Sequence, residues 1–171
     1  GIIREGKNPP DRRVPMSPRQ CLLFLESFPQ SQLVIQPSPI RCFSDQEYLD
    51  AGLTLQEDLS DCEVLLGVKE VPQEMLIPQK TYLFFSHTYK KQPYNRDLLR
   101  SIIEKKIRLI DYEMLKEPSG KRVIGFGRYA GIVGCYNAFR AYGEMTGTYQ
   151  LKPAHQCFDR REMEGELVKV K

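Results

Sequence analysis

Short apolar runs alternate with amphipathic segments along most of this chain, and this alternation constrains the fold more than any other feature. The apolar runs of strand length are 2–3, 32–36, 53–56, 63–68, 81–86 and 107–111. The segments with a helical pattern are 17–28, 44–52, 95–105 and about 127–146. Alternating strands and helices favour a largely parallel sheet. We therefore predict a three-layer α/β fold of the flavodoxin or Rossmann type, with helices on both faces of a mostly parallel sheet.

Local signals predict several element boundaries. Ser17 and Pro18 suit the N-cap and the first position of a helix. Ser44 and Glu47 have the spacing of a capping box, and Gly147 suits the residue that follows a helix. We also predict a short strand at 123–126.

The chain changes character after Gly147. Residues 148–165 show little periodicity, and 166–171 resemble the entry to a new strand. We therefore predict one domain over 1–147, which includes the long helix, followed by a linker over 148–171. A second domain is expected after Lys171.

Composition excludes several classes of protein. The net charge of +3 comes from 25 basic and 22 acidic residues, which is too balanced for a nucleic-acid-binding domain. No apolar stretch approaches the length that spans a bilayer. The five cysteines form no C-x-x-C pair, so a disulfide framework or a zinc site is not expected. These features favour a reducing, cytoplasmic location.

Charged residues follow three of the predicted strands. His87 follows strand 81–86, Lys69 follows strand 63–68, and Arg13 lies beyond the opening strand. In open α/β sheets, ligands bind outside the carboxyl ends of the strands. We predict a site there for an anionic substrate that exchanges protons.

Each of these residues has a catalytic and an ordinary interpretation. His87 titrates near neutral pH, and a lysine near other cations, such as Lys69, has a lowered pKa and can act as an acid or base. The guanidinium of Arg13 offers a fork for a carboxylate. Alternatively, His87 is an ordinary packed or surface residue, Lys69 pairs with Glu70, and Arg13 forms a solvated turn with Asp11.

Two further candidates lie beyond the last buried strand. Glu113 follows strand 107–111 and could take part in proton transfer or simply pair with a cation. Arg122 precedes the apolar run 123–126 and is a second candidate for carboxylate binding.

Residues 125–130 match the dinucleotide fingerprint G-x-G-x-x-G/A. The acidic residue expected at the end of a following strand is absent, and Glu144 lies inside the same helical segment. We therefore reject this match as a nucleotide site and attribute Gly127, Gly131 and Gly134 to close helix packing.

Five motifs occur in an order that resembles a known family. They are Arg-Arg-Val-Pro-Met-Ser-Pro (12–18), Gly-Val-Lys-Glu (67–70), Phe-Ser-His-Thr-Tyr-Lys (85–90), Asp-Tyr-Glu (111–113) and Lys-Arg-Val-Ile-Gly-Phe-Gly-Arg-Tyr-Ala-Gly (121–131). Over residues 1–147 the chain resembles the amino-terminal domain of lysine-forming saccharopine dehydrogenase and the lysine–oxoglutarate reductase domain. More distantly, it resembles alanine dehydrogenase and the transhydrogenase α subunit. Asn8 stands where some saccharopine dehydrogenases carry a lysine.

The resemblance implies the substrate-side domain of a two-domain oxidoreductase that converts saccharopine to lysine and 2-oxoglutarate. NAD or NADP would be bound mainly by a Rossmann domain after Lys171, and neither a cofactor site nor a metal site is expected within these 171 residues. The resemblance assigns acid–base roles to Lys69 and His87, and Glu113 would tune the charge of the site. Arg13 and Arg122 would bind the substrate, and we count Phe126 with them.

Two alternatives stay open. The chain could belong to an alanine dehydrogenase or transhydrogenase-like subunit, which differs in substrate and assembly. It could also be a stand-alone module that binds an amino acid or a protein without catalysis. The fragment alone is expected to be inactive, and assembly into a homo-oligomer is left open.

Overall fold

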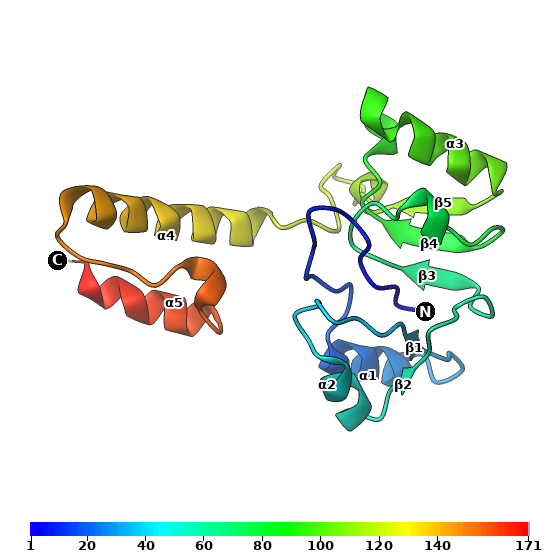
Figure 1. The fold of residues 1–171 in the computed structure, drawn as a ribbon, viewed down its shortest axis with the longest axis horizontal. Helices are drawn as coiled ribbons and strands as arrows, with labels where there is room; N and C mark the ends of the chain where they lie inside the picture. The colour runs from blue at the N-terminus through cyan, green and yellow to red at the C-terminus, as the bar shows by residue number, and fades with distance from the viewer. Residues whose placement is uncertain (171) are drawn as a thin grey trace. The chain divides into compact units, whose positions relative to one another are not determined.

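The computed structural model describes residues 1–170, of which the first 124 form a compact α/β unit (Figure 1). Its strands are β1 (Val34–Ile35), β2 (Thr54–Leu55), β3 (Val64–Leu66), β4 (Thr81–Phe84) and β5 (Arg108–Asp111). Its α-helices are α1 (Pro18–Ser27), α2 (Asp45–Asp50) and α3 (Arg96–Glu104). Four short 3-10 helices complete it: η1 (Gln73–Met75), η2 (Thr88–Lys90), η3 (Pro93–Asn95) and η4 (Tyr112–Met114). This is a mixed α/β fold with parallel strands.

The amino-terminal segment joins the two parts of the sheet. Ile2 forms parallel bridges to Ile35 of β1 and to Leu66 of β3. The spatial order is therefore β2, β1, the Ile2 segment, β3, β4 and β5, and every pairing is parallel. If the Ile2 segment counts as the first strand, this order is 3-2-1-4-5-6, which changes direction between Ile2 and β3. Ligands of open α/β sheets bind at such a switch point.

Alternate residues of the central strands pack into two different hydrophobic clusters. Ile2 and Leu66 pack with Cys21 of α1 and Tyr48 of α2. Their neighbours Ile3 and Leu65 belong to the cluster that contains Leu98 and Ile102 of α3. Because successive side chains of a strand point to opposite faces, α3 covers one face of the sheet and α1 and α2 the other.

The predicted boundaries in this unit are confirmed within a few residues. Capping boxes open both α1 and α2, with Ser17 bonded to Gln20 and Ser44 bonded to Glu47. Each serine hydroxyl accepts a hydrogen bond from a backbone N–H of the first turn, which would otherwise be unsatisfied. These signals are local, so the sequence reports them directly.

The strand predicted at 123–126 is absent. The N–H of Val123 donates to the carbonyl of Leu115 at 2.9 Å, and Lys116 and Arg122 form one isolated antiparallel bridge. Between them the chain turns at Gly120, whose φ of 83° suits glycine. This segment therefore forms a short hairpin-like turn instead of an added strand.

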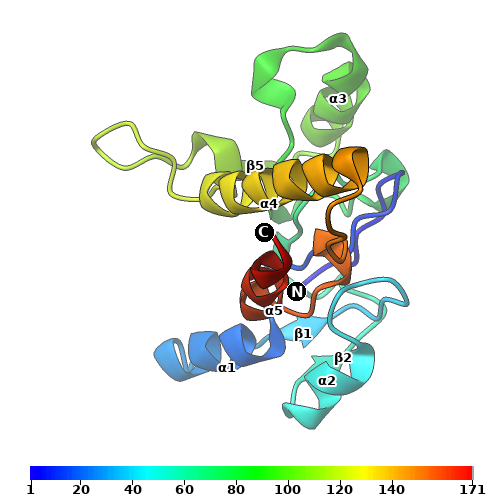
Figure 2. The ribbon, with the colours of Figure 1, turned by 90° about the vertical axis from the view of Figure 1, so that its left-hand side faces the viewer.

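A second compact unit begins at Gly125 and contains two α-helices. They are α4 (Gly127–Thr146), which ends at the left-handed Gly147 as predicted, and α5 (Arg160–Glu166). Two 3-10 helices, η5 (Ala154–Gln156) and η6 (Leu167–Lys169), flank α5. Figure 2 shows α4 and α5 in this unit from a second direction.

The strand entry predicted at 166–171 is wrong for the described residues, because this segment continues α5 as η6. Met163, Leu167 and Val170 have helical spacing and pack in one cluster with Tyr136 of α4. Lys171 lies outside the described residues. The domain and linker boundaries at 147 and 148 stay predictions. None of the described helices combines the length and the apolar character needed to cross a bilayer.

Candidate functional site

Polar side chains gather at the carboxyl ends of the central strands. Glu5 follows the Ile2 segment, Lys69 and Glu70 follow β3, His87 follows β4, and Glu113 follows β5. Because the strands are parallel, their carboxyl ends share one edge of the sheet. Lys69 and His87 therefore follow two neighbouring strands, β3 and β4, as predicted.

The imidazole of His87 lies between two carboxylates. Its Nδ1 is 3.2 Å from Oε1 of Glu70, and its Nε2 is 3.8 Å from Oε2 of Glu113. The ring also stacks on Phe85, with 6.4 Å between the ring centroids. Both ring nitrogens of His87 therefore face carboxylate oxygens, one from the end of β3 and one from the end of β5.

Glu70 connects His87 to a lysine from the amino-terminal loop. The ammonium of Lys7 donates to Oε2 of Glu70 at 2.7 Å, and the Glu70 side chain is only 13% exposed. Burial is the largest single influence on the pKa of Glu70 and raises it. The hydrogen bond from Lys7, a backbone hydrogen bond and the charges of Lys7 and His87 together outweigh burial, so the pKa lies below its usual value. Glu70 therefore stays charged beside His87 at neutral pH.

Glu113 is buried and forms ion pairs with several cationic side chains. Arg122 donates to its Oε1 at 2.9 Å, and the ammonium of Lys90 is 3.1 Å from its Oε2. His87 faces the same carboxylate. Glu113 therefore connects the loop that follows β4, which carries His87 and Lys90, with the turn that carries Arg122. Two of the predicted residues, Glu113 and Arg122, are thus in direct contact.

Glu5 fixes the backbone at Lys69. Its carboxylate accepts hydrogen bonds from the N–H groups of Val68 at 2.7 Å and Lys69 at 2.8 Å. Burial raises the pKa of Glu5, and these two hydrogen bonds partly offset that rise. Burial, and to a lesser degree the charge of Glu5, raise the pKa of Tyr112 to about 12. The carboxylate of Glu5 thus stands at the switch point of the sheet.

Arg13 pairs with Asp11, as the alternative interpretation expected. Its Nε donates to Oδ1 of Asp11 at 2.9 Å, and its Nη2 makes a further ion pair with Oδ2. The hydrogen bond from Arg13 is the main cause that lowers the pKa of Asp11, and the charge of Lys69 acts in the same direction. Asp11 is therefore paired with Arg13 and also senses the charge of Lys69.

Three of the six predicted site residues are thus linked through one carboxylate, because Glu113 contacts both His87 and Arg122. Arg13 pairs separately with Asp11. The pairing of Lys69 with Glu70, offered as an alternative, is not found among the described residues: Glu70 pairs with Lys7 and His87 instead. Phe126 precedes α4 in the second unit, and its part in substrate binding stays a prediction.

Apart from Glu113, the carboxylates that organise this site were not recognised from the sequence. Glu70 was considered only as a partner for Lys69, and no role was assigned to Glu5 or Asp111. Each of these residues lies within a few positions of a strand end, and that placement is the signal that could have found them. Which partner each one takes depends on contacts between residues far apart in the chain.

The described residues do not fit a dinucleotide at Gly125–Ala130. The fingerprint needs a strand before the glycines, and residues 123–126 form none. Within the second unit, the structure shows no close packing at Gly127, Gly131 or Gly134, because a Cβ at any of them would meet no atom of that unit within 4 Å outside the adjacent backbone. Close approach occurs instead at Gly143, where a Cβ would lie 2.5 Å from Tyr149. Residues 1–170 also hold no cluster of three His, Cys, Asp or Glu side chains suited to a metal ion.

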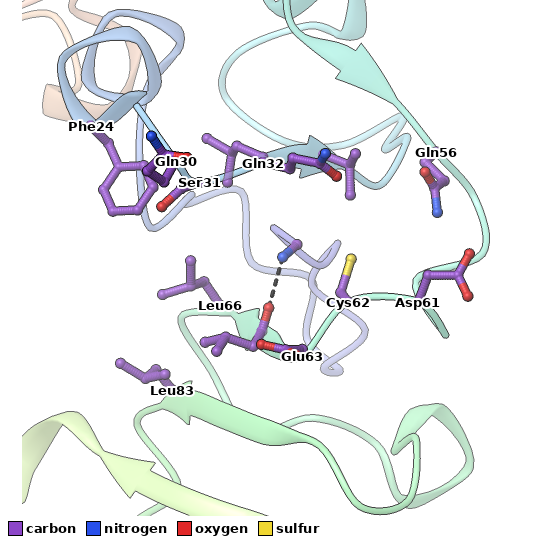
Figure 3. Close-up of a pocket in the computed structure, with 14 residues that line it drawn as sticks. Phe24, Gln30, Ser31, Gln32, Gln56, Asp61, Cys62, Glu63, Leu66 and Leu83 are labelled. Atoms are coloured by element: carbon purple, nitrogen blue, oxygen red, sulfur yellow. Dashed lines mark hydrogen bonds between the residues drawn. The ribbon is translucent and has the colours of Figure 1, made fainter. Parts of the chain in front are cut away.

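A cavity of about 750 Å³ lies elsewhere on the sheet (Figure 3). Its lining includes Val34 and Val64, the first residues of β1 and β3, and the amino group of Gly1, which donates to the carbonyl of Val64 at 2.7 Å. It therefore opens at the amino ends of the strands, opposite the ends that carry Lys69 and His87.

Comparison with known proteins gives a consistent result. Bovine (Bos taurus) mitochondrial alpha-aminoadipic semialdehyde synthase is 44% identical over 142 residues, which is 83% of this chain and 15% of the relative. The Arabidopsis thaliana alpha-aminoadipic semialdehyde synthase is 38% identical over 84% of the chain and 14% of the relative. The lysine-forming, NAD(+)-dependent saccharopine dehydrogenase of Yarrowia lipolytica is 31% identical over 77% of the chain and 37% of the relative. The chain thus spans less than two fifths of the length of these relatives.

A solved structure of L-alanine dehydrogenase shares the fold, with a TM-score of 0.67 and 19% identity over 86% of this chain and 42% of that one. The family model described as "Alanine dehydrogenase/PNT, N-terminal domain" matches residues 1–133, which contain the Ile2 segment, all five strands and the residues of the site in the first unit. With most of its length matched by that model, the chain belongs to the alanine dehydrogenase/PNT N-terminal domain family.

Proposed function

We propose that this chain is the substrate-binding and acid–base part of an NAD(P)-dependent oxidoreductase that converts saccharopine to lysine and 2-oxoglutarate. The observation that carries the proposal is the position of His87 between Glu70 and Glu113, with Lys69 next to Glu70 in the chain. The relatives named as saccharopine dehydrogenase and alpha-aminoadipic semialdehyde synthase support the substrate.

The proposed roles follow from the proton transfers that the reaction needs. The secondary amine of saccharopine must lose a proton before its C–N bond is oxidised to an imine. Water then adds to the imine carbon. The resulting hydroxyl loses a proton as the C–N bond breaks, and the departing nitrogen gains one, which gives lysine and 2-oxoglutarate. Two groups that accept and donate protons serve these steps, and we assign His87 and Lys69 to them.

Glu70 and Glu113 set the charge around these groups in the proposed mechanism. Glu70 fixes the ring of His87 through Nδ1 and stabilises its protonated form. Nε2 faces Glu113, which is in turn partly neutralised by Lys90 and Arg122. This balance leaves His87 able to release the proton that it takes up.

The arginines are assigned to recognition of substrate carboxylates. Arg13 and Arg122 lie at two sides of the network, with side chains that are 43% and 56% exposed. Planar guanidinium groups suit carboxylates, of which saccharopine carries more than one. We extend this recognition role to Phe126.

The oxidation itself requires NAD or NADP, and Gly125–Ala130 lacks the preceding strand that a dinucleotide fingerprint needs. We propose that a Rossmann domain elsewhere in the protein binds the cofactor. We also propose that residues 1–147 form one three-layer, Rossmann-like domain, as the strand order supports. A cytoplasmic location stays a prediction, although the animal relatives carry "mitochondrial" in their names.

The test is an assay of the complete gene product with lysine, 2-oxoglutarate and NADH or NADPH. Saccharopine formation supports the proposal. Reductive amination of pyruvate by ammonia would instead support the alanine dehydrogenase alternative, which the solved L-alanine dehydrogenase structure favours by fold alone. Binding of saccharopine without turnover would identify the non-catalytic module.

A further inference from the structure

One buried carboxylate, that of Asp111, holds the backbone on both sides of the site. Asp111 is the last residue of β5 and is 7% exposed. Its Oδ2 accepts hydrogen bonds from the N–H groups of Ser86 at 3.2 Å and His87 at 3.1 Å, and also from the Ser86 hydroxyl. Its Oδ1 accepts from the N–H of Glu113 at 2.9 Å. One side chain therefore ties the end of β4 to the end of β5.

The backbone at His87 needs such support. His87 has φ 56° and ψ 7°, a left-handed conformation that a non-glycine residue adopts at a cost in free energy. The N–H that donates to Asp111 belongs to this same residue. The hydrogen bond therefore acts at the point where the chain turns to direct the imidazole toward Glu70 and Glu113.

A neutral side chain of the same shape could not replace Asp111. Three of its four donors are backbone N–H groups, and the fourth is the Ser86 hydroxyl, which also contacts the hydroxyl of Thr88 at 2.8 Å. A carboxylate accepts at both oxygens, whereas an asparagine presents an NH₂ group to donors on one side. With asparagine at this position, either His87 or Glu113 would lose its backbone anchor.

We propose that Asp111 is a positioning residue, which sets the distance between the His87 ring and Glu113 by anchoring the backbone of both. The inference rests on the proposed function insofar as it concerns catalysis. It gives a role to a residue whose carboxylate contacts His87 and Glu113 only through their backbone N–H groups.

The first test does not need activity. The chain contains two histidines, His87 and His155, and His155 is exposed in the second unit. In Asp111→Asn of the 171-residue chain, the ring ¹⁵N resonances of His87 should shift, and those of His155 should not. His87→Gln assigns the signals. Asp45→Asn is the matched control, because Asp45 also accepts from a backbone N–H, that of Ser38, at 3.0 Å and lies in α2.

The second test uses the complete gene product. Asp111→Asn should lower kcat about 10–100-fold, because a small displacement of a reacting group is costly. In a His87→Gln background, the same change should alter kcat by less than about 3-fold, since the residue that it positions is gone. A purely structural role predicts the same fold-loss in both backgrounds. If Asp111→Asn does not fold, Asp111→Glu moves the carboxylate by one methylene and serves both readouts.

Two outcomes would overturn the proposal: unchanged His87 resonances in the folded variant, or equal losses of kcat in the two backgrounds. If His87→Gln itself keeps full activity, the proposed function fails instead. In that case the resonance shifts still decide whether Asp111 positions His87.

Discussion

Nδ1 of His87 lies 3.2 Å from Oε1 of Glu70, across a separation of 17 residues in the chain. Glu70 follows β3 and His87 follows β4, and these neighbouring parallel strands pair with Leu65 opposite Tyr82. The pairing of the strands therefore brings the carboxylate of Glu70 and the imidazole of His87 together.

His87→Gln in the complete gene product is expected to lower kcat by about 10²–10⁴-fold, the usual range for a positioned acid or base. It should also remove one limb of the pH profile of kcat/KM. His155→Gln replaces the other histidine of the chain and should leave kcat unchanged. Steady-state kinetics across pH measure both. Full activity of His87→Gln with an unaltered profile would refute the assignment.

Lys69→Met should lower kcat by a similar factor of about 10²–10⁴, because the methionine cannot exchange a proton. Its backbone hydrogen bond to Glu5 does not depend on the side chain, so the fold should be retained. Lys80→Met is the control, since Lys80 precedes β4 at the opposite end of the strands. Comparable turnover in the two variants would argue against a role for Lys69.

Arg13→Ala is expected to act mainly on binding. Loss of the guanidinium should raise KM for the carboxylated substrate about 10–100-fold, as removal of a charged hydrogen bond does. Arg12→Ala is the neighbouring control, because the Nε of Arg12 donates to the carbonyl of Ile40, away from Asp11. A fall in kcat with no change in KM would instead place Arg13 in the chemical steps.

Glu70 should make stability depend on pH in a predictable direction. Its pKa is lowered in the folded chain, so its ion pair with Lys7 contributes fully above the ordinary value of 4.5 and is lost as pH falls through the lower folded value. Lys7 is 34% exposed, which limits the contribution to about 1 kcal/mol or less. Urea unfolding between pH 3 and pH 7 should show Glu70→Gln less stable than wild type near neutrality, with the difference vanishing in acid. A difference that grows in acid would contradict this sign.

Ile2 is expected to be important for stability because it joins the two parts of the sheet. It is fully buried and bridges Ile35 and Leu66. Ile2→Ala should lower the free energy of unfolding by about 2–5 kcal/mol through the cavity that it leaves. Ile103→Ala, at a position that is 66% exposed, should cost much less. Denaturant midpoints of the two variants give the comparison.

Some features of this protein follow from its sequence alone, because they depend on residues close together in the chain. The serine caps of α1 and α2 satisfy backbone groups within three residues, and Gly147 ends α4 at its own position. The apolar runs at β3, β4 and β5 likewise predict strands, and they place Lys69 and His87 at strand ends.

Tertiary structure decided what local patterns could not. The segment 166–171 alternates like a strand, but Leu167 and Val170 pack with Tyr136 of α4 and follow a helical course. The partners of Glu5, Glu70 and Asp111 lie 2 to 64 residues away, and most of them follow the ends of other strands. Strand order and register bring these carboxylates to their partners, and neither is encoded in any short stretch of the chain. The sequence therefore determined which residues reach the edge of the sheet, and the packing of the strands determined which of them meet.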